Sequence, residues 1–198
     1  MNIVNVGYRS TNYYVLAGSA PRLLVDAGWP GTLGTLQHTC RRMDIDLAAI
    51  PYQLATHYHP DHAGLVQNLK SLGVRLIVLD TQLAGIPLLR TYVKPQDHYQ
   101  DIVLGDNIVL TAAESRAFLA RIGIQGQIIS TPGHSDDSVT LILDDGPAFT
   151  GDLTVPEAGR PEAMDLVRAS WDRIRAAGGR TIYPGHGPVG PLGAGRGA

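Results

Sequence analysis

A short segment near residue 60 concentrates side chains that can bind a metal ion. Residues 56–62 read THYHPDH and contain three histidines and one aspartate. Neutral imidazole and carboxylate groups are ligands for zinc, iron and manganese. Because alternate residues of an extended segment point the same way, His57 and His59 can bind one ion, whereas Asp61 and His62 face elsewhere and can serve a second. A polar turn with solvated histidines does not account for four such residues so close together.

The chain on either side of this segment indicates how it is held. Residues 50–55 are an apolar stretch and residues 64–72 follow a helical pattern. We therefore expect a strand, a loop that carries the four residues, and then a helix. Four donors from one loop do not complete a two-metal site, so other parts of the chain must supply more.

Further candidate ligands recur at the ends of predicted strands. Three residues each follow a short apolar strand and have a glycine or proline close by: His134, Asp152 and His186. Strand ends on one edge of a sheet converge, and glycine lets the backbone approach closely there. Asp26 also ends a predicted strand, at residues 22–25. Its carboxylate either caps the following loop or orients a metal-bound histidine, and both interpretations remain open.

The remaining histidines and the single cysteine fall outside this pattern. His38 lies in a predicted helix at residues 32–43, and His98 lies in the irregular stretch 80–101, so we expect both at the surface. Cys40 excludes an intrachain disulfide, and packing is its expected role.

Alternating apolar patterns and turn residues predict many short elements. Strands are expected at 12–16, 22–25, 74–78, 127–130, 139–143, 148–150 and 181–183, and helices at 32–43, 64–72, 111–122 and 161–177. The helix at 111 begins with a capping box. Residues 80–101 are expected to form a loop or broken helix that walls a pocket, with Trp29, Tyr58, Tyr92 and Tyr99 as candidate lining residues.

Length and composition limit the class of protein. The 198 residues, 44% hydrophobic and 17% charged, predict one domain over 1–198 with a flexible tail from about residue 188. A net charge of −2 gives no indication of nucleic-acid binding. No apolar run reaches membrane-spanning length and no signal peptide is evident, so we expect a cytoplasmic protein with no membrane partner.

The order of the motifs resembles the metallo-β-lactamase superfamily of metallohydrolases. His-x-His-x-Asp-His at 57–62 is followed by Gly-His, Gly-Asp and Gly-His, and the match extends from Asp26 to His186. The resemblance implies an α/β fold, an αββα sandwich of two mixed β-sheets with helices outside. It also implies a binuclear site: His57, His59 and His134 for the first ion, Asp61, His62 and His186 for the second, Asp152 bridging both, and Asp26 in support.

The same resemblance implies hydrolysis. A hydroxide that bridges two divalent ions, Zn²⁺ or alternatively Fe or Mn, would attack the substrate, and Asp61 would pass a proton to the leaving group. True β-lactamases of this superfamily lack the bridging aspartate, so Asp152 argues against antibiotic hydrolysis. Glyoxalase II enzymes resemble this core but add a C-terminal glutathione-binding domain. Since only residues 187–198 follow the last motif, we expect that domain to be absent.

We expect the substrate to be a small ester, thioester or lactone. The acidic residues of the segment Ser135-Asp136-Asp137-Ser138 are expected to discourage anionic substrates. Two alternatives stay open: a phosphodiesterase or nuclease of the same superfamily, and an iron-dependent oxidoreductase similar to persulfide dioxygenases. A phosphodiester assay tests the first, and metal content together with oxygen consumption tests the second.

Overall fold

Two mixed β-sheets form the centre of the computed structural model, which describes residues 1–154 and 164–193. The first sheet has the order β1-β2-β3-β4-β5-β6. Its strands are β1 (Asn2–Asn5), β2 (Tyr14–Ala17), β3 (Pro21–Val25), β4 (Tyr52–Leu54), β5 (Arg75–Leu79) and β6 (Ile108–Leu110). Strands β1 to β3 are antiparallel, and β3 to β6 are parallel.

The second sheet has the order β11-β10-β9-β8-β7. Its strands are β7 (Gly126–Ser130), β8 (Val139–Leu143), β9 (Pro147–Gly151), β10 (Thr181–Pro184) and β11 (Gly190–Pro191). Only β9 and β10 run parallel; the other neighbours are antiparallel.

The sheets pack face to face because successive side chains of each strand point to opposite faces. In β8, Val139, Leu141 and Leu143 enter the cluster between the sheets, whereas Ile142 faces the outer layer. Leu24 of β3 likewise faces outward, between the inward-facing residues of the same strand. The sequence pattern therefore specifies both faces of each sheet.

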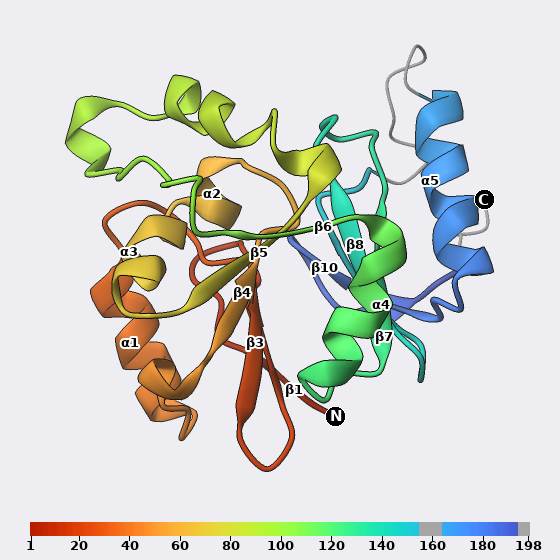
Figure 1. The fold of residues 1–198 in the computed structure, drawn as a ribbon, viewed down its shortest axis with the longest axis horizontal. Helices are drawn as coiled ribbons and strands as arrows, with labels where there is room; N and C mark the ends of the chain where they lie inside the picture. Colours follow the sequence, from red (N-terminus) through yellow and green to blue (C-terminus); the bar gives the residue numbers. More distant parts are fainter. Residues whose placement is uncertain (155–163, 194–198) are drawn as a thin grey trace.

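Helices cover both outer faces. Helix α1 (Leu33–Arg42) and α3 (Val66–Ser71) bury Leu36, Cys40 and Leu69 against the first sheet. Helix α5 (Met164–Ala176) packs Trp171 and Ile174 against the second sheet, on the opposite side of the molecule (Figure 1). Helix α4 (Ala112–Arg121) begins at the predicted capping box and contributes Phe118 and Leu119 to the cluster between the sheets. The predicted αββα sandwich is confirmed.

Some local predictions differ from the structure. The helix expected at 64–72 corresponds to α3, and a separate helical turn, α2 (Pro60–Ala63), precedes it because Pro60 starts a turn directly after extended His59. Asp61 and His62 are therefore helical rather than part of a loop. Residues 80–101 form three 3₁₀ segments, η2 (Asp80–Gln82), η3 (Ile86–Tyr92) and η4 (Pro95–Asp97), and a further one, η1 (Leu47–Ala49), precedes β4.

Two short strands have no counterpart in the sequence prediction. Strand β6 adds to the parallel edge of the first sheet, and β11 pairs with β10. The pairing of β11 differs from the flexible tail expected from about residue 188. The predicted start of the last helix, at 161–163, and the end of the tail, at 194–198, lie outside the described residues.

Candidate metal centre

Residues from both sheets meet at one edge of the sandwich. His57 follows β4 of the first sheet, whereas His134, Asp152 and His186 follow β7, β9 and β10 of the second. The strand ends therefore bring together residues that are up to about 130 positions apart, as the recurrence at strand ends predicted. All seven predicted ligands fall into groups whose donor atoms lie within 4.8 Å of one another.

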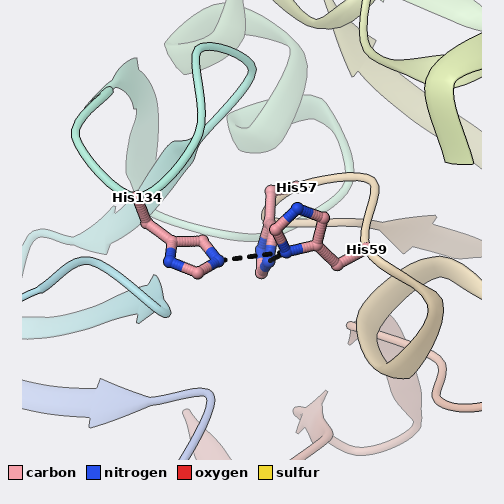
Figure 2. Close-up of side chains that lie close together, drawn as sticks. All are labelled: His57, His59 and His134. Carbon is pink, nitrogen blue, oxygen red and sulfur yellow. Dashed lines mark hydrogen bonds between the residues drawn. The ribbon is translucent and has the colours of Figure 1, made fainter. Parts of the chain in front are cut away.

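Three imidazoles form the first group (Figure 2). Nδ1 of His59 lies 3.0 Å from Nε2 of His57 and 3.0 Å from Nε2 of His134. Alternation along the chain places His57 and His59 on the same side, and the loop after β7 brings His134 from the second sheet. Three ring nitrogens that converge in this way suit one cation.

A carboxylate and two imidazoles form the second group. Oδ2 of Asp61 lies 3.1 Å from Nε2 of His186 and 3.5 Å from Nε2 of His62. The short helix α2 carries Asp61 and His62. Asp61 shares no donor group with His57 or His59, as predicted. His62, in contrast, lies beside His57 with ring centroids 4.3 Å apart, and His57, His62 and Asp152 form a third donor group.

Asp152 lies between the two groups. Its Oδ1 is 3.2 Å from Nε2 of His62, and its Oδ2 is 3.2 Å from Nε2 of His186 and 3.8 Å from Nε2 of His134. Nε2 of His62 and Oδ1 of Asp152 are buried without a hydrogen-bond partner among the described residues. Buried polar atoms normally have a partner, so this pair fits a bound cation.

Asp26 contacts both the histidine loop and one of its histidines, as each of the two interpretations left open by the sequence requires. Oδ1 of Asp26 accepts hydrogen bonds from the backbone N–H of Thr56 at 2.7 Å and from the Thr56 hydroxyl at 3.0 Å. These bonds fix the start of the loop that carries His57 and His59. Its Oδ2 lies 2.9 Å from Nδ1 of His62. This contact places the ring proton on Nδ1 and leaves Nε2 free as a donor to a metal.

Two further histidines are oriented by groups that sequence reasoning missed. Nδ1 of His186 donates to the backbone carbonyl of Ser10 at 2.8 Å, and Nδ1 of His57 lies 3.2 Å from the hydroxyl of Thr56. Each contact points Nε2 into the cluster. Thr56 directly precedes the histidine motif, so its contact with His57 could have been predicted from the sequence. No sequence spacing indicates that Ser10 contacts His186.

Burial and charge prepare the cluster for a cation. Burial and the neighbouring imidazoles lower the pKa of His57 well below its usual value, and burial also lowers the pKa of His134, so both rings are neutral, the form that can bind a metal. Burial opposes charge on His62, but the carboxylates of Asp26 and Asp152 outweigh it and raise the pKa of His62. A divalent cation would replace that proton.

The carboxylates respond to the same neighbours. Burial raises the pKa of Asp61 and of Asp152, yet the positive charge of the adjacent His62 outweighs burial and leaves the pKa of both acids below the usual value. Both groups are therefore ionised, which is the form that binds a metal.

The acidic segment after His134 connects the two histidine loops. Oδ2 of Asp137 accepts the backbone N–H of Tyr58 at 2.7 Å. Buried Gln82 donates to the carbonyls of Ala55 at 3.0 Å and of Asp137 at 3.2 Å. Asp137 therefore holds backbone in place, and of the two acids Asp136 is the exposed one. The predicted repulsion of anionic substrates by this segment therefore depends mainly on Asp136.

A pocket of about 320 Å³ opens beside the cluster. Its polar side consists of His134, Asp152 and His186, and its apolar side includes Leu153, Trp171 and Ile182. None of the described residues that line it belongs to the stretch 80–101 that was expected to form the wall. The wall of this pocket instead comes from β9, α5 and β10 and from residues that follow β7, β9 and β10.

The four aromatic candidates for the pocket wall differ in position. The ring of Tyr92 lies 5.0 Å from that of His59 and is exposed beside the cluster. Tyr58 is fully buried in the apolar core against β5, so it is no wall residue. Tyr99 packs against the same core, and Trp29 is partly exposed. Tyr92 is thus the candidate that reaches a predicted ligand.

The residues that were set aside lie where they were expected. His38 and His98 are exposed, and Cys40 is fully buried among apolar side chains. Burial raises the pKa of the Cys40 thiol to about 11, so it is unreactive. No helix within residues 1–154 or 164–193 is long and apolar enough to cross a membrane.

Comparison with known proteins supports one family. The model of the metallo-beta-lactamase superfamily matches residues 6–186. An atrochrysone carboxyl ACP thioesterase of Aspergillus fumigatus is 32% identical over 191 residues, which cover 91% of this chain and 52% of that protein. The Beta-lactamase-like protein 2 homolog of Drosophila melanogaster is 27% identical over 195 residues, which cover 91% of this chain and 60% of that protein.

Solved structures share the same fold. A metallo-beta-lactamase family protein from Thermus thermophilus superposes with a TM-score of 0.76 at 21% identity, over 96% of this chain and 74% of that one. The chain thus spans about half to three fifths of the length of the curated relatives named above and about three quarters of this structure.

Proposed function

This chain belongs to the metallo-beta-lactamase superfamily, and from that membership we propose that it is a binuclear metal-dependent hydrolase of small acyl compounds. The proposal has three parts: the two metal ions, the role of Asp61, and the class of substrate. Each is supported by a different feature of the cluster and its pocket.

The two-ion centre is supported above all by the unpartnered Nε2 of His62 and Oδ1 of Asp152. In our proposal, His57, His59 and His134 hold the first ion, and Asp61, His62 and His186 hold the second. Asp152 would contribute to both sites, since one of its oxygens faces His62 and the other lies between His134 and His186. The donors are all nitrogen and oxygen, which suits Zn²⁺ and also accepts iron or manganese.

The side chains around the ions bind, orient and move protons. When bound, a pair of divalent ions supplies a hydroxide nucleophile at neutral pH and a Lewis acid for the substrate oxygen. The contacts of Asp61 with Thr11, His62 and His186 involve Oδ2. Oδ1 is therefore the atom that carries a proton to the leaving oxygen or sulfur. Asp26 and Ser10 keep the imidazoles of His62 and His186 in one orientation throughout.

The substrate class is supported by the pocket beside the cluster. Leu153, Trp171 and Ile182 offer an apolar surface next to His134 and Asp152, which suits an uncharged acyl group better than a polyanion. The relative from Aspergillus fumigatus carries the name of a thioesterase, and thioester cleavage fits this pocket. We therefore propose esters, thioesters or lactones as substrates.

Metal content is the first test. Purified protein is expected to bind about two divalent ions per chain, most of them zinc, because seven donors form overlapping groups and Asp152 lies beside histidines of both proposed ion sites. Elemental analysis of the active protein measures this number. Full activity with a single ion per chain contradicts the binuclear mechanism, and iron together with oxygen consumption points to the oxidoreductase instead.

Substrate class is the second test. In a side-by-side panel, acyl esters, thioesters and lactones are expected to have higher kcat/KM than phosphodiesters or RNA. Replacing Ile182→Thr, which keeps the branched shape but makes the pocket wall polar, is expected to lower kcat/KM for apolar acyl substrates by about 10-fold with metal content intact.

A matched control separates the pocket from general packing. Ile129 is also half-buried and packs against the same cluster under α5, but it does not line the pocket. Ile129→Thr is therefore expected to leave the substrate preference unchanged. Phosphodiesters as the best substrates, or equal effects of both threonine variants on acyl substrates, would contradict the proposed substrate class.

A further inference from the structure

A segment near the N-terminus lies against the loop that carries His186. Thr11 forms a β-bridge with His186, and the backbone N–H of Asn12 donates to the carbonyl of Gly185 at 2.7 Å. The side-chain amide of Asn12 donates to the carbonyls of Pro184 and Gly187, both at 2.9 Å. These bonds hold the backbone of the His186 loop both before and after His186.

The same segment also contacts two of the proposed ligands directly. The carbonyl of Ser10 accepts from Nδ1 of His186 at 2.8 Å, and the hydroxyl of Thr11 donates to Oδ2 of Asp61 at 3.1 Å. The side chain of Thr11 is 2% exposed, so this hydroxyl has little access to water as an alternative partner. Two consecutive residues therefore orient two donors of a single group.

The three-histidine group is held by different residues. Among the described residues, its hydrogen bonds beyond the group itself come from Thr56, and Asp137 and Gln82 fix the backbone of its loops. Segment 10–12 makes none of these contacts. Asp26 supports both halves, since it bonds Thr56 and Nδ1 of His62. Segment 10–12 contacts His186 and Asp61 of the second group, so a change at Thr11 can alter that half alone.

We propose that Thr11 is a positioning residue that sets the affinity of the Asp61–His62–His186 group for its ion. The inference rests on the two-ion centre proposed above. The Thr11 hydroxyl holds the Asp61 carboxylate in the orientation that meets the imidazoles of His62 and His186. Without this bond the Asp61 carboxylate can rotate. Binding of the ion must then fix its orientation, and the entropy lost in doing so lowers the affinity for the ion.

The test measures metal binding in the full chain with Zn²⁺ buffered over a series of free concentrations. Thr11→Val keeps the branched shape and removes the hydroxyl, whereas Thr11→Ser keeps the hydroxyl. In Thr11→Val, one of the two binding steps is expected to weaken by about 10- to 100-fold while the other is unchanged, because partners of metal ligands typically contribute this much. Thr11→Ser is expected to restore the weakened step.

Ser115→Ala controls for lost stability. The Ser115 hydroxyl joins α4 to β7 by bonding both the N–H and the carbonyl of Ile128, and it is buried away from the cluster. This variant is expected to melt at a lower temperature and still bind two ions with wild-type affinity. It shows what a loss of packing alone does to metal binding.

The outcomes separate this inference from the proposed function. Wild-type protein that binds fewer than two ions contradicts the binuclear centre, and the role of Thr11 fails with it. Two ions in the wild type with unchanged binding in folded Thr11→Val overturns only the role of Thr11. Equal weakening of both steps, or no rescue by Thr11→Ser, also overturns it.

Discussion

Replacing His59 or His134 with alanine is expected to abolish hydrolysis and to release metal. Each side chain contributes one of three ring nitrogens, and Nδ1 of His59 lies 3.0 Å from the donor atoms of both other histidines. Loss of a residue that merely supports a ligand costs about 10- to 100-fold, so loss of a ligand is expected to cost more than about 100-fold in kcat/KM. Elemental analysis and kinetics on the same preparations measure both effects.

His38→Ala is the matched control for these variants. His38 lies exposed on α1, outside the three donor groups of the described residues. Its replacement is expected to change metal content and kcat/KM little. If all three alanine variants lose activity and metal equally, the histidines of the cluster have been misassigned.

Replacing Gly185 with alanine is expected to disrupt the centre without removing any ligand. A Cβ atom at this position would lie 2.4 Å from Oδ1 of Asp152 and 2.5 Å from Cε1 of His62. Both distances are too short for non-bonded atoms, and both partners are held on other sides, His62 by Asp26 and Asp152 by its strand end. The expected result is a loss of bound metal and of at least about 10-fold in kcat/KM, because outer contacts of a ligand typically contribute this much.

Gly190→Ala serves as the control in the same part of the chain. A Cβ atom at Gly190 would meet no atom within 4 Å, and its backbone does not require positive φ. This variant is expected to keep two ions and wild-type activity. A Gly185→Ala protein that retains both ions and full kcat/KM would show that the Asp152 carboxylate can move freely, contrary to the crowded arrangement.

Many residues of the centre could be predicted from the sequence because short motifs of neighbouring residues mark them. His57 and His59 share a side of the chain through simple alternation, and a proline-started turn separates Asp61 from them. Glycine or proline beside His134, Asp152 and His186 marks strand ends, which must lie near one edge of a sheet. The fold was predicted from the order of these motifs, through their resemblance to the metallo-β-lactamase superfamily, whereas the structure shows which face of a strand such as β8 meets which cluster.

Only the tertiary structure determined which residues support the centre and where the pocket lies. The contacts of Ser10 with His186 and of Asp137 with Tyr58 join residues 176 and 79 positions apart, and no periodicity records such pairs. Strands β6 and β11 are so short that pairing with neighbours, rather than their own pattern, defines them. The stretch 80–101 was predicted as the pocket wall from its composition, yet the cavity beside His134 and His186 is lined by Trp171 and Ile182, and Tyr92 of that stretch lies beside His59 instead. Composition describes a segment, whereas the packing of distant segments decides which side chains face a shared cavity.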